Sequence, residues 1–264
     1  MSNGEKARKM RLVIDVGNTN IKIGGYVNNN LLFISRIDTK EKYTYEQYAS
    51  KINEILFKNN YTFKDITEAI ISIGVLNAGI GLVDALKKEF GITPLIVNSD
   101  LKLNFNIKIP NSKELGADLI CGAVAGLEKL NAPLAIYDFG TATTISIIDK
   151  DRNFMGGIII PGIEISKNAL INNTSLPHYE LSDSIKVING DTIDAMNAGS
   201  IFSGICIVDE MTSRIEEELK MPVKVILTGG LSKLIYDHIK RDVLLYENLT
   251  LDGLNRLYEM NTKR

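Results

Sequence analysis

Two short segments place an aspartate, a glycine and several hydroxyl or amide side chains between apolar, β-branched runs. The first is "DVGNTN" at 15–20, and the second is "DFGTATT" at 138–144. Glycine in a turn lets the backbone approach a ligand closely, and successive backbone N–H groups can converge there on phosphate oxygens. One such segment is equally typical of an ordinary hairpin turn. The repetition favours two turns that face each other across a polyphosphate.

The polar side chains of these segments suggest separate roles. Asp15 ends an apolar run and is expected to hold Mg²⁺ through water, because Mg²⁺ prefers carboxylate, water and substrate phosphates. Lys22 is expected on the same face as Asn20, within reach of a phosphate. Further donors in the two turns are Asn18, Thr19, Asn20, Thr141, Thr143 and Thr144. A third segment, "TGG" at 228–230, is expected to leave room for a base or a ribose.

Asp118 lies in the first turn of an expected helix, in "KELGADLICG". A carboxylate at that position is favoured by the helix dipole by about 0.3–1 kcal/mol, which alone could account for it. The alternative is a general base beside the cleft, which takes the proton of a substrate hydroxyl as that hydroxyl attacks the γ-phosphate. The preceding Gly116, and the lack of another well-placed base in the set, favour the catalytic role.

The elements that must position these residues follow from the periodicity of apolar side chains. Strands are expected at 11–16, 21–26, 31–38, 68–76, 93–98, 133–138, 143–149, 154–160 and 223–230, and helices at 44–58, 79–90, 117–130, 162–172, 191–219, 231–240 and 249–260. The order strand, Asp-x-Gly turn, strand, strand therefore occurs twice. This duplication predicts a two-domain α/β protein with a cleft between its halves. We expect a flexible leader at 1–9 and domains at 10–112 and 113–264.

Seven segments together carry a resemblance to a known family. They are "DVGNTN", "ELGAD", "DFGTATT", "GGIIIPGIEIS", "GDTIDAMNAGSI", "LTGGLSK" and "LTLDGLNRLYE", in the order that the family has them. In these segments the chain resembles the type III pantothenate kinases, a family that also contains the Bvg accessory factor proteins. The resemblance implies duplicated actin/hexokinase/ribonuclease H-like domains with an interdomain nucleotide cleft. It also implies ATP-dependent phosphorylation of pantothenate to 4'-phosphopantothenate, the first step of coenzyme A biosynthesis.

The same resemblance implies partners and individual site residues. The partners are ATP, Mg²⁺, a monovalent cation (K⁺ or NH₄⁺) and a second copy of the chain in a homodimer. Asp118 is implied as the base and Asp138 as the ligand of the monovalent cation. Residues implied in ATP binding are Asp15, Val16, Gly17, Asn18, Thr19, Asn20, Ile21, Lys22, Thr141, Gly229 and Gly230. Residues implied in binding pantothenate are Ile109, Gly116, Ala117, Asp118, Leu119 and Thr192.

Two positions depart from the pattern of that family. An Arg is usual directly after the Asp of its Gly-Ala-Asp motif, whereas this chain has Leu119, and a pocket Tyr is usual where this chain has Ile109. An Arg-to-Leu change removes a fixed cation that a carboxylate-bearing substrate could use. The ATP side therefore matches while the acceptor side is altered. A kinase for another small hydroxyl compound and a non-catalytic accessory relative remain as alternatives.

The composition excludes several other classes of protein. A chain of 264 residues that is 45% hydrophobic and 23% charged, with a net charge of −2, is typical of a folded protein with a substantial core. Lys and Arg are scattered, without the basic surface that binds nucleic acid. No run approaches the roughly 18 apolar residues of a membrane span, and 1–10 lack the apolar core of a secretory signal. We expect a cytoplasmic protein that binds neither nucleic acid nor membrane.

The cysteines and one pair of glycines have simpler interpretations. Cys121 and Cys206 lie in apolar helical runs, are expected to be buried, and show no metal-ligand spacing with the two histidines. The segment "GIGLVDA" at 79–85 begins as a dinucleotide-binding fingerprint would, but Asp84 occupies the third small position. We interpret its glycines as a tight helix N-terminus. A P-loop kinase is disfavoured because the Walker-type Gly-x-x-x-x-Gly-Lys-Ser/Thr pattern is missing.

Overall fold

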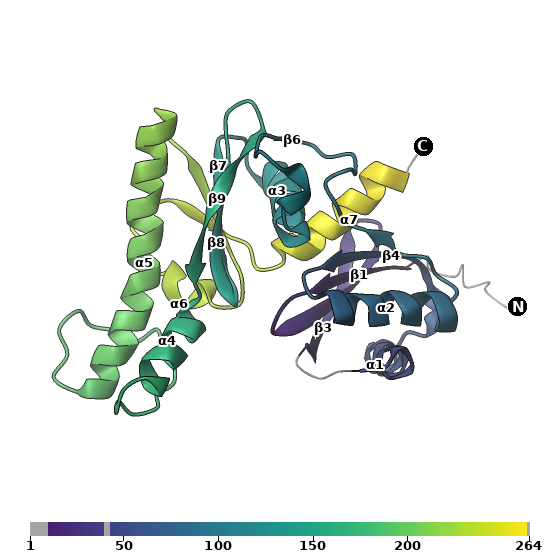
Figure 1. Ribbon diagram of the computed structural model, residues 1–264, viewed down its shortest axis with the longest axis horizontal. Helices are drawn as coiled ribbons and strands as arrows, with labels where there is room; N and C mark the ends of the chain where they lie inside the picture. The colour runs from purple at the N-terminus through teal and green to yellow at the C-terminus, as the bar shows by residue number, and fades with distance from the viewer. Residues whose placement is uncertain (1–9, 40–42, 263–264) are drawn as a thin grey trace, which may run out of the picture. The chain divides into compact units, whose positions relative to one another are not determined.

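The computed structural model describes residues 10–39 and 43–262 and divides into two compact units (Figure 1). Unit 1 comprises Met1–Leu103, Asn111–Ala125 and Thr250–Arg264, and unit 2 comprises Asn104–Pro110 and Gly126–Leu249. The expected leader at 1–9 lies outside the described residues. The expected boundary after residue 112 separated two continuous domains. In the structure, 113–125 and the C-terminal segment group with unit 1 instead.

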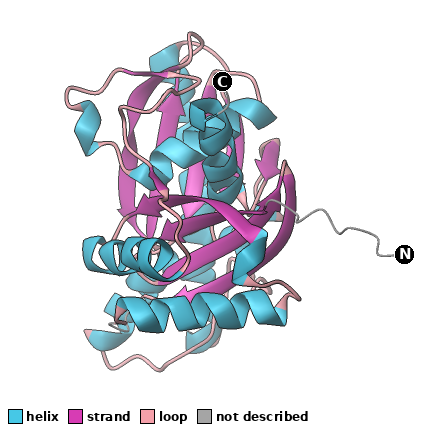
Figure 2. Cartoon of the chain, turned by 90° about the vertical axis from the view of Figure 1, so that its right-hand side faces the viewer, coloured by secondary structure: helices cyan, strands magenta, loops and turns pink. Residues whose placement is uncertain are grey.

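Unit 1 contains a five-stranded mixed sheet (Figure 2). Its strands are β1 (Met10–Val16), β2 (Asn20–Val27), β3 (Asn30–Asp38), β4 (Ile66–Ile73) and β5 (Leu95–Ile96), in the spatial order β3-β2-β1-β4-β5. Strand β1 is antiparallel to β2 and parallel to β4. The first three strands therefore form the expected meander, and the two later strands extend the sheet on the other side of β1.

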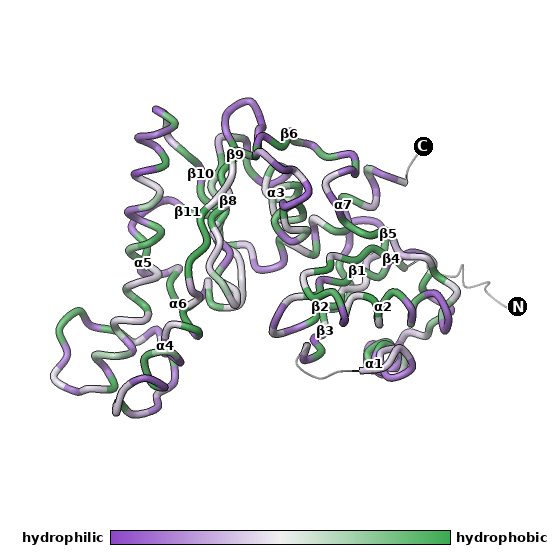
Figure 3. Tube along the Cα trace, in the orientation of Figure 1, coloured by the Kyte–Doolittle hydropathy of each residue, from purple (hydrophilic) through white to green (hydrophobic). Residues whose placement is uncertain are grey.

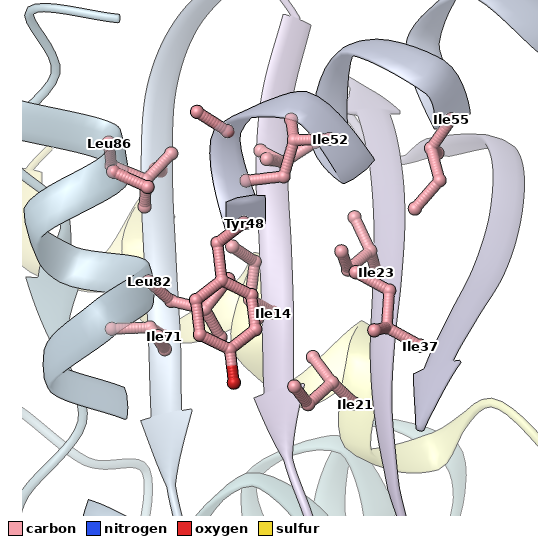
Figure 4. Packing of buried hydrophobic residues seen from close by; sticks show 14 of the residues in the cluster. Ile14, Ile21, Ile23, Ile37, Tyr48, Ile52, Ile55, Ile71, Leu82 and Leu86 are labelled. Atoms are coloured by element: carbon pink, nitrogen blue, oxygen red, sulfur yellow. The ribbon is translucent and has the colours of Figure 1, made fainter. Parts of the chain in front are cut away.

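Two helices cover one face of this sheet. They are α1 (Tyr45–Lys58) and α2 (Leu76–Glu89), and they enclose a core with β1, β2 and β4. Figure 4 shows Tyr48 of α1 directed toward the sheet, where Ile14 and Ile71 lie, with Leu82 of α2 beside it. A Thr44 capping box begins α1, which satisfies backbone N–H groups that would otherwise be unpaired. The stripe of apolar side chains predicted for 44–58 is thus the buried face of a real helix.

The opposite face of the sheet is contacted by the C-terminal helix α7 (Leu249–Thr262). The Arg11 guanidinium, buried on β1, donates to the Glu68 carboxylate at 2.7 Å and to Asn255 Oδ1 at 2.6 Å. It also lies 4.2 Å from the centroid of the Tyr258 ring. Because a buried cation is stable only when it is paired, this network fixes α7 to a definite place on the sheet.

Unit 2 repeats the strand order of unit 1. Its sheet has the order β11-β10-β7-β8-β9-β6, with β7 antiparallel to β8 and parallel to β10. The strands are β6 (Asn106–Ile107), β7 (Leu134–Phe139), β8 (Ala142–Ile148), β9 (Asn153–Pro161), β10 (Lys224–Thr228) and β11 (Val243–Leu245). Read from β9 to β11, the order corresponds to β3-β2-β1-β4-β5, which confirms the duplication predicted from the sequence.

The helices of unit 2 pack on the apolar strands of its sheet, which are largely green in Figure 3. They are α4 (Ile163–Asn172), α5 (Thr192–Leu219) and α6 (Ser232–Tyr236). Side chains of α5 contribute Ile201, Ile205 and Val208 to the core around Tyr137. The Tyr137 hydroxyl lies 2.7 Å from Thr212 Oγ1, and burial raises the pKa of Tyr137 to about 12. Within the described residues, no helix has the length and apolarity needed to cross a membrane.

Several elements differ from their predicted extent. Strand β4 ends at Ile73, the Gly74 N–H still donates to the Val16 carbonyl, and α2 begins at Leu76. Gly79 and Gly81 therefore lie inside α2 and not at its N-terminus, so that interpretation was wrong. A Cβ on Gly79 would overlap the Ile73 side chain, and one on Gly81 would lie 2.8 Å from the Tyr48 ring. These glycines allow close packing.

Short elements account for the remaining differences. Strands β6 and β11 were not predicted, since strands of two or three residues carry no readable alternation. Helix α6 is shorter than the predicted 231–240. Two 3₁₀ turns, Phe63–Asp65 and Ser112–Glu114, were also not predicted.

Helix α3 (Ala117–Lys129) meets α7 within unit 1 at a point of backbone contact. A Cβ on Gly253 of α7 would overlap the Cys121 carbonyl of α3, with the carbonyl carbon 2.5 Å away. Glycine at this position is therefore a packing requirement of the α3–α7 crossing.

We expect Gly253→Ala to lower the free energy of unfolding by about 1–3 kcal/mol, as overpacked sites do, because α3 and α7 must separate to admit the methyl group. The matched control is Gly199→Ala in α5, where an added Cβ has no neighbour within 4 Å. The control should raise the free energy of unfolding by about 0.5–1 kcal/mol through backbone entropy alone. Denaturant unfolding measures the free energy of unfolding of both variants. Equal changes of the same sign would contradict the close packing of α3 against α7 at Gly253.

Candidate functional site

The strand register of unit 1 places three polar side chains in one row. Asp15 of β1 pairs with Lys22 of β2 and with Ser72 of β4. Side chains that are paired directly across a sheet project from the same face. The row therefore lies on the face opposite Ile14 and Ile71, at the carboxyl ends of the parallel strands β1 and β4. Ligands of open α/β sheets bind beyond such ends. Asp15 and Lys22 are predicted from the sequence, whereas Ser72, inside an apolar run, is not.

The turn that follows Asp15 is anchored by the end of β3. The Gly17 N–H donates to the Asn20 carbonyl at 3.1 Å, and Thr39 Oγ1 donates to the Gly17 carbonyl at 2.8 Å. The Thr39 N–H donates to the Thr19 carbonyl at 3.0 Å. The N–H of Gly17 is thus used inside the turn and not directed at a ligand. Three other residues of the turn are exposed, namely Asn18, Thr19 and Asn20, whereas Val16 and Ile21 are buried.

The expected base, Asp118, is exposed in the first turn of α3. The Ile120 N–H donates to the Gly116 carbonyl at 3.0 Å, so the helix starts directly after Gly116. A Cβ on Gly116 would lie 2.6 Å from Asp118 Oδ1. Glycine at this position therefore leaves the Asp118 carboxylate in its observed orientation. Ala117 and Leu119, on either side of the carboxylate, are partly exposed.

The ionisation of the buried Cys121 thiol is affected by both Asp15 and Asp118. Burial raises the pKa of the Cys121 thiol well above its usual range, and the negative charges of Asp15 and Asp118 raise it further. Both carboxylates therefore lie near enough to this thiol to act on its ionisation. Asp15 and Asp118, which are more than one hundred residues apart in the sequence, thus both affect the ionisation of one buried side chain of unit 1.

Unit 2 has a second aspartate in an equivalent position. Asp138 of β7 pairs with Thr144 of β8 and Thr228 of β10, as Asp15 does with Lys22 and Ser72. Gly229 follows Thr228 with a φ of +93°, and a Cβ there would lie 2.5 Å from Asp138 Oδ1. Only glycine adopts this backbone readily and leaves that space open. Asp138 and the first glycine of "TGG" are therefore side by side.

The other predicted residues of unit 2 are spread over its surface. Thr141 and Gly230 are exposed, and a Cβ on Gly162 would overlap the Thr141 carbonyl. Thr192 is exposed at the start of α5, directly after the Asp191 cap. Ile109, partly exposed, lies beside Gly156, whose Cβ would be 3.8 Å from Ile109 Cγ2. A polar pocket of about 310 Å³ lies before α5, lined by Ser184, Lys186, Ile188, Asn189, Gly190 and Asp194. It contains none of the predicted residues.

The donors present fit a Mg²⁺ ion that is held mainly by a substrate. Among residues 10–39 and 43–262, no group of three or more His, Cys, Asp or Glu side chains is arranged to hold a metal by itself. Mg²⁺ typically binds through one or two carboxylates, with waters and substrate phosphates completing its shell. Asp15, with the unpaired Ser72 hydroxyl beside it in the row, provides such a partial site.

The chain matches one protein family over most of its length. The family model described as type III pantothenate kinase matches residues 11–214. A type III pantothenate kinase of Exiguobacterium sp. strain AT1b is 39% identical over 255 residues, which is 96% of this chain and all of that protein. A type III pantothenate kinase of Halalkalibacterium halodurans is 38% identical over 253 residues, again 96% of this chain and all of the relative.

Solved structures agree in fold. A ROK family glucokinase from Streptomyces griseus, in complex with glucose and AMPPNP, superposes with a TM-score of 0.55 at 14% identity. The match covers 94% of this chain and 98% of that one. At this identity the likeness concerns the fold alone, and it is the actin/hexokinase-like fold that the resemblance implied.

The two cysteines differ in exposure, which corrects one expectation. Cys121 is fully buried as expected, whereas Cys206 of α5 is exposed. At pH 8 we expect a maleimide to label Cys206 promptly, because its thiol is accessible. Cys121 should be labelled only on unfolding, since it is enclosed and burial keeps its pKa high. Mass spectrometry of the labelled protein checks this, and Cys206→Ser is the control that should remove the prompt reaction. Prompt labelling of Cys121 would contradict its buried position.

Proposed function

The chain belongs to the type III pantothenate kinase family, and we propose that it transfers the γ-phosphoryl group of ATP to the primary hydroxyl of pantothenate with Asp118 as the base. The observation that carries this function is the full-length match to type III pantothenate kinases. The product would be 4'-phosphopantothenate, which makes the reaction the first step of coenzyme A biosynthesis. The intact Asp118 also supports an enzyme over a non-catalytic relative, because binding alone has no chemical need for a base at this position.

The roles proposed for unit 1 follow from its polar row. Asp15 would hold Mg²⁺ through water, and Lys22 beside it supplies a positive charge for a phosphate oxygen. Mg²⁺, when bound, would neutralise charge on the transferring phosphate. Asp118 is exposed, so an acceptor hydroxyl can reach it and transfer its proton to the carboxylate as the oxygen attacks phosphorus. Such a site acts mostly by positioning and by charge stabilisation.

Unit 2 is proposed to contribute the monovalent cation and further nucleotide contacts. Asp138, flanked by Gly229, would hold K⁺ or NH₄⁺ against the phosphates. Thr141, Gly229 and Gly230 would contact ATP, and Thr192 would contact pantothenate. Support comes from the exposed positions of Thr141, Gly230 and Thr192, and from the correspondence between Asp138 and Asp15 in the duplicated strand order.

The acceptor side differs from the family pattern in charge. Leu119 and Ile109 are apolar and partly exposed, so neither offers a fixed cation or a hydroxyl to the pantothenate carboxylate. These two residues favour, as a second candidate, a kinase that phosphorylates a different small hydroxyl compound. A neutral amide analogue of pantothenate is the acceptor that distinguishes the two candidates, because it lacks the carboxylate.

We further propose that the protein is a cytoplasmic homodimer that binds neither nucleic acid nor membrane. Unit 2 exposes apolar side chains at the start of α5 and in the loop before it, including Val187, Ile188 and Ile193. Burial of such side chains against a second copy would remove them from water. Sedimentation equilibrium tests the dimer, and a monomer at micromolar concentration would refute it.

The first experiment follows phosphorylated product by mass spectrometry with ATP, Mg²⁺, K⁺ and pantothenate. We expect product from the wild type, and a fall in kcat of about 10²–10⁴-fold in Asp118→Asn, because general-base catalysis is lost. Nucleotide binding should be unchanged. Asp84→Asn, which replaces a helical carboxylate paired with Lys88 on α2, is the matched control and should keep full activity.

Other results of this experiment would change the assignment. Turnover near that of the wild type in Asp118→Asn would remove Asp118 as the base. Product with the amide analogue but not with pantothenate would select the second candidate. Nucleotide binding without product from any acceptor would contradict a kinase.

For the cation role, we expect Asp138→Asn to raise the K⁺ concentration for half-maximal activity by about 10-fold or more, since loss of a group that only orients a metal ligand already costs about 10–100-fold. The reason is that the amide lacks the charge that attracts the ion. Asp151→Asn in the exposed turn between β8 and β9 is the control. Activity titrated against K⁺ at constant ionic strength measures the shift. An unaltered K⁺ dependence in Asp138→Asn would show that Asp138 does not hold the cation.

A further inference from the structure

The Ser72 hydroxyl is buried without a hydrogen-bond partner. Ser72 is 1% exposed, and its Oγ is one of three buried side-chain atoms without a partner in the part of the chain that the structure describes. A buried hydroxyl left in this state costs about 1–3 kcal/mol, so such groups in native proteins are rare and usually have a reason. Ser72 also interrupts the apolar run "AIISI" at 69–73, where an apolar side chain would fit a buried strand better.

The position of Ser72 indicates which group it serves. Its direct neighbour across the parallel ladder is Asp15, on the same face of the sheet. Neighbouring strands are about 4.8 Å apart, so rotation about the Ser72 side chain brings its hydroxyl within hydrogen-bond reach of the Asp15 carboxylate. The next pair on this face is Val13 with Ile70, which offers no acceptor. Asp15 is therefore the side chain beside which this hydroxyl is placed.

The duplicated half of the chain repeats this pairing. Asp138 of β7 has Thr228 as its parallel neighbour on β10, and Thr228 is 3% exposed. On the antiparallel side the two aspartates differ, with Lys22 beside one and Thr144 beside the other. A buried hydroxyl beside the aspartate is thus common to both halves, although the residues around it are mostly apolar. The repetition links the hydroxyl to its position beside the aspartate.

We propose that Ser72 is a positioning residue for Mg²⁺: its hydroxyl donates a hydrogen bond to the Asp15 carboxylate when Mg²⁺ and nucleotide bind, and so fixes the oxygen that faces the ion. Asp15 already interacts within the protein in the absence of ligand. The hydroxyl is held beside it until binding reorients the carboxylate. Groups that orient a metal-binding side chain in this way typically change metal affinity by 10–100-fold. The inference rests on the proposed function, since it deepens the role of Asp15.

The test compares Ser72→Ala with the wild type in two measurements. In the ligand-free protein, the melting temperature should not fall, because the hydroxyl that is removed has no partner. In the presence of AMPPNP, calorimetric titration with Mg²⁺ should show an apparent affinity for Mg²⁺ reduced by about 10–100-fold. Binding of AMPPNP in EDTA should be unchanged. If Ser72 had a purely structural role, Ser72→Ala would change the melting temperature and leave the apparent affinity for Mg²⁺ unchanged.

Two further variants complete the design. Ser72→Thr keeps a hydroxyl at this position and should restore most of the Mg²⁺ affinity. Ser146→Ala removes a buried hydroxyl on β8 that faces Ile136 and no aspartate, and should leave the Mg²⁺ affinity unchanged.

The outcomes separate this inference from the proposed function. If the wild type binds Mg²⁺ with AMPPNP and Ser72→Ala does so with equal affinity, the role of Ser72 is wrong while the kinase stands. A lower melting temperature of ligand-free Ser72→Ala, with unchanged Mg²⁺ affinity, would likewise overturn it. If the wild type does not bind Mg²⁺ with AMPPNP, the proposed function fails and the role of Ser72 fails with it.

Discussion

The pairing of β1 with β2 on one side and β4 on the other is the constraint on which unit 1 depends. Side chains alternate along a strand, so the register that buries Leu12, Ile14 and Val16 under α1 and α2 also places Asp15 on the opposite face. A slip of one residue would exchange the two sets. The free energy of burying the core therefore also fixes the position of the polar row.

Unit 2 has the same strand pairing around its aspartate, with different side chains beside it. Asp138 takes the place of Asp15, and each aspartate has a hydroxyl on its parallel neighbour. The antiparallel neighbour is Lys22 in one unit and Thr144 in the other. The lysine places a positive charge beside the carboxylate in unit 1, whereas the threonine in unit 2 is neutral. The duplication thus supplies two equivalent positions that substitution has made chemically unlike.

Two glycines allow the backbone to pack closely beside Cys121 and Asp138. Gly253 lets α7 meet the backbone of α3 at Cys121, the residue whose ionisation responds to both Asp15 and Asp118. Arg11 of β1 contacts the same helix through Asn255, while its guanidinium is also paired with Glu68 of β4. Gly229 leaves space beside Asp138. In each case a missing side chain or a paired buried charge determines how near a functional group lies to its neighbours.

The sequence by itself determined the duplicated strand order, most helices and the family, because these depend on local periodicity and on motifs that are continuous in the chain. The proposals for Asp15, Asp118 and Asp138 came from these motifs. The tertiary structure decided which distant residues lie together and which side chains are exposed, because no local pattern contains this information. Helix α7 belongs with the first unit because Asn255 meets Arg11, and Cys206 is exposed although it lies in an apolar run. Ser72 became visible only through the register that pairs it with Asp15, since periodicity shows that a face is buried but not which distant residue lies beside it.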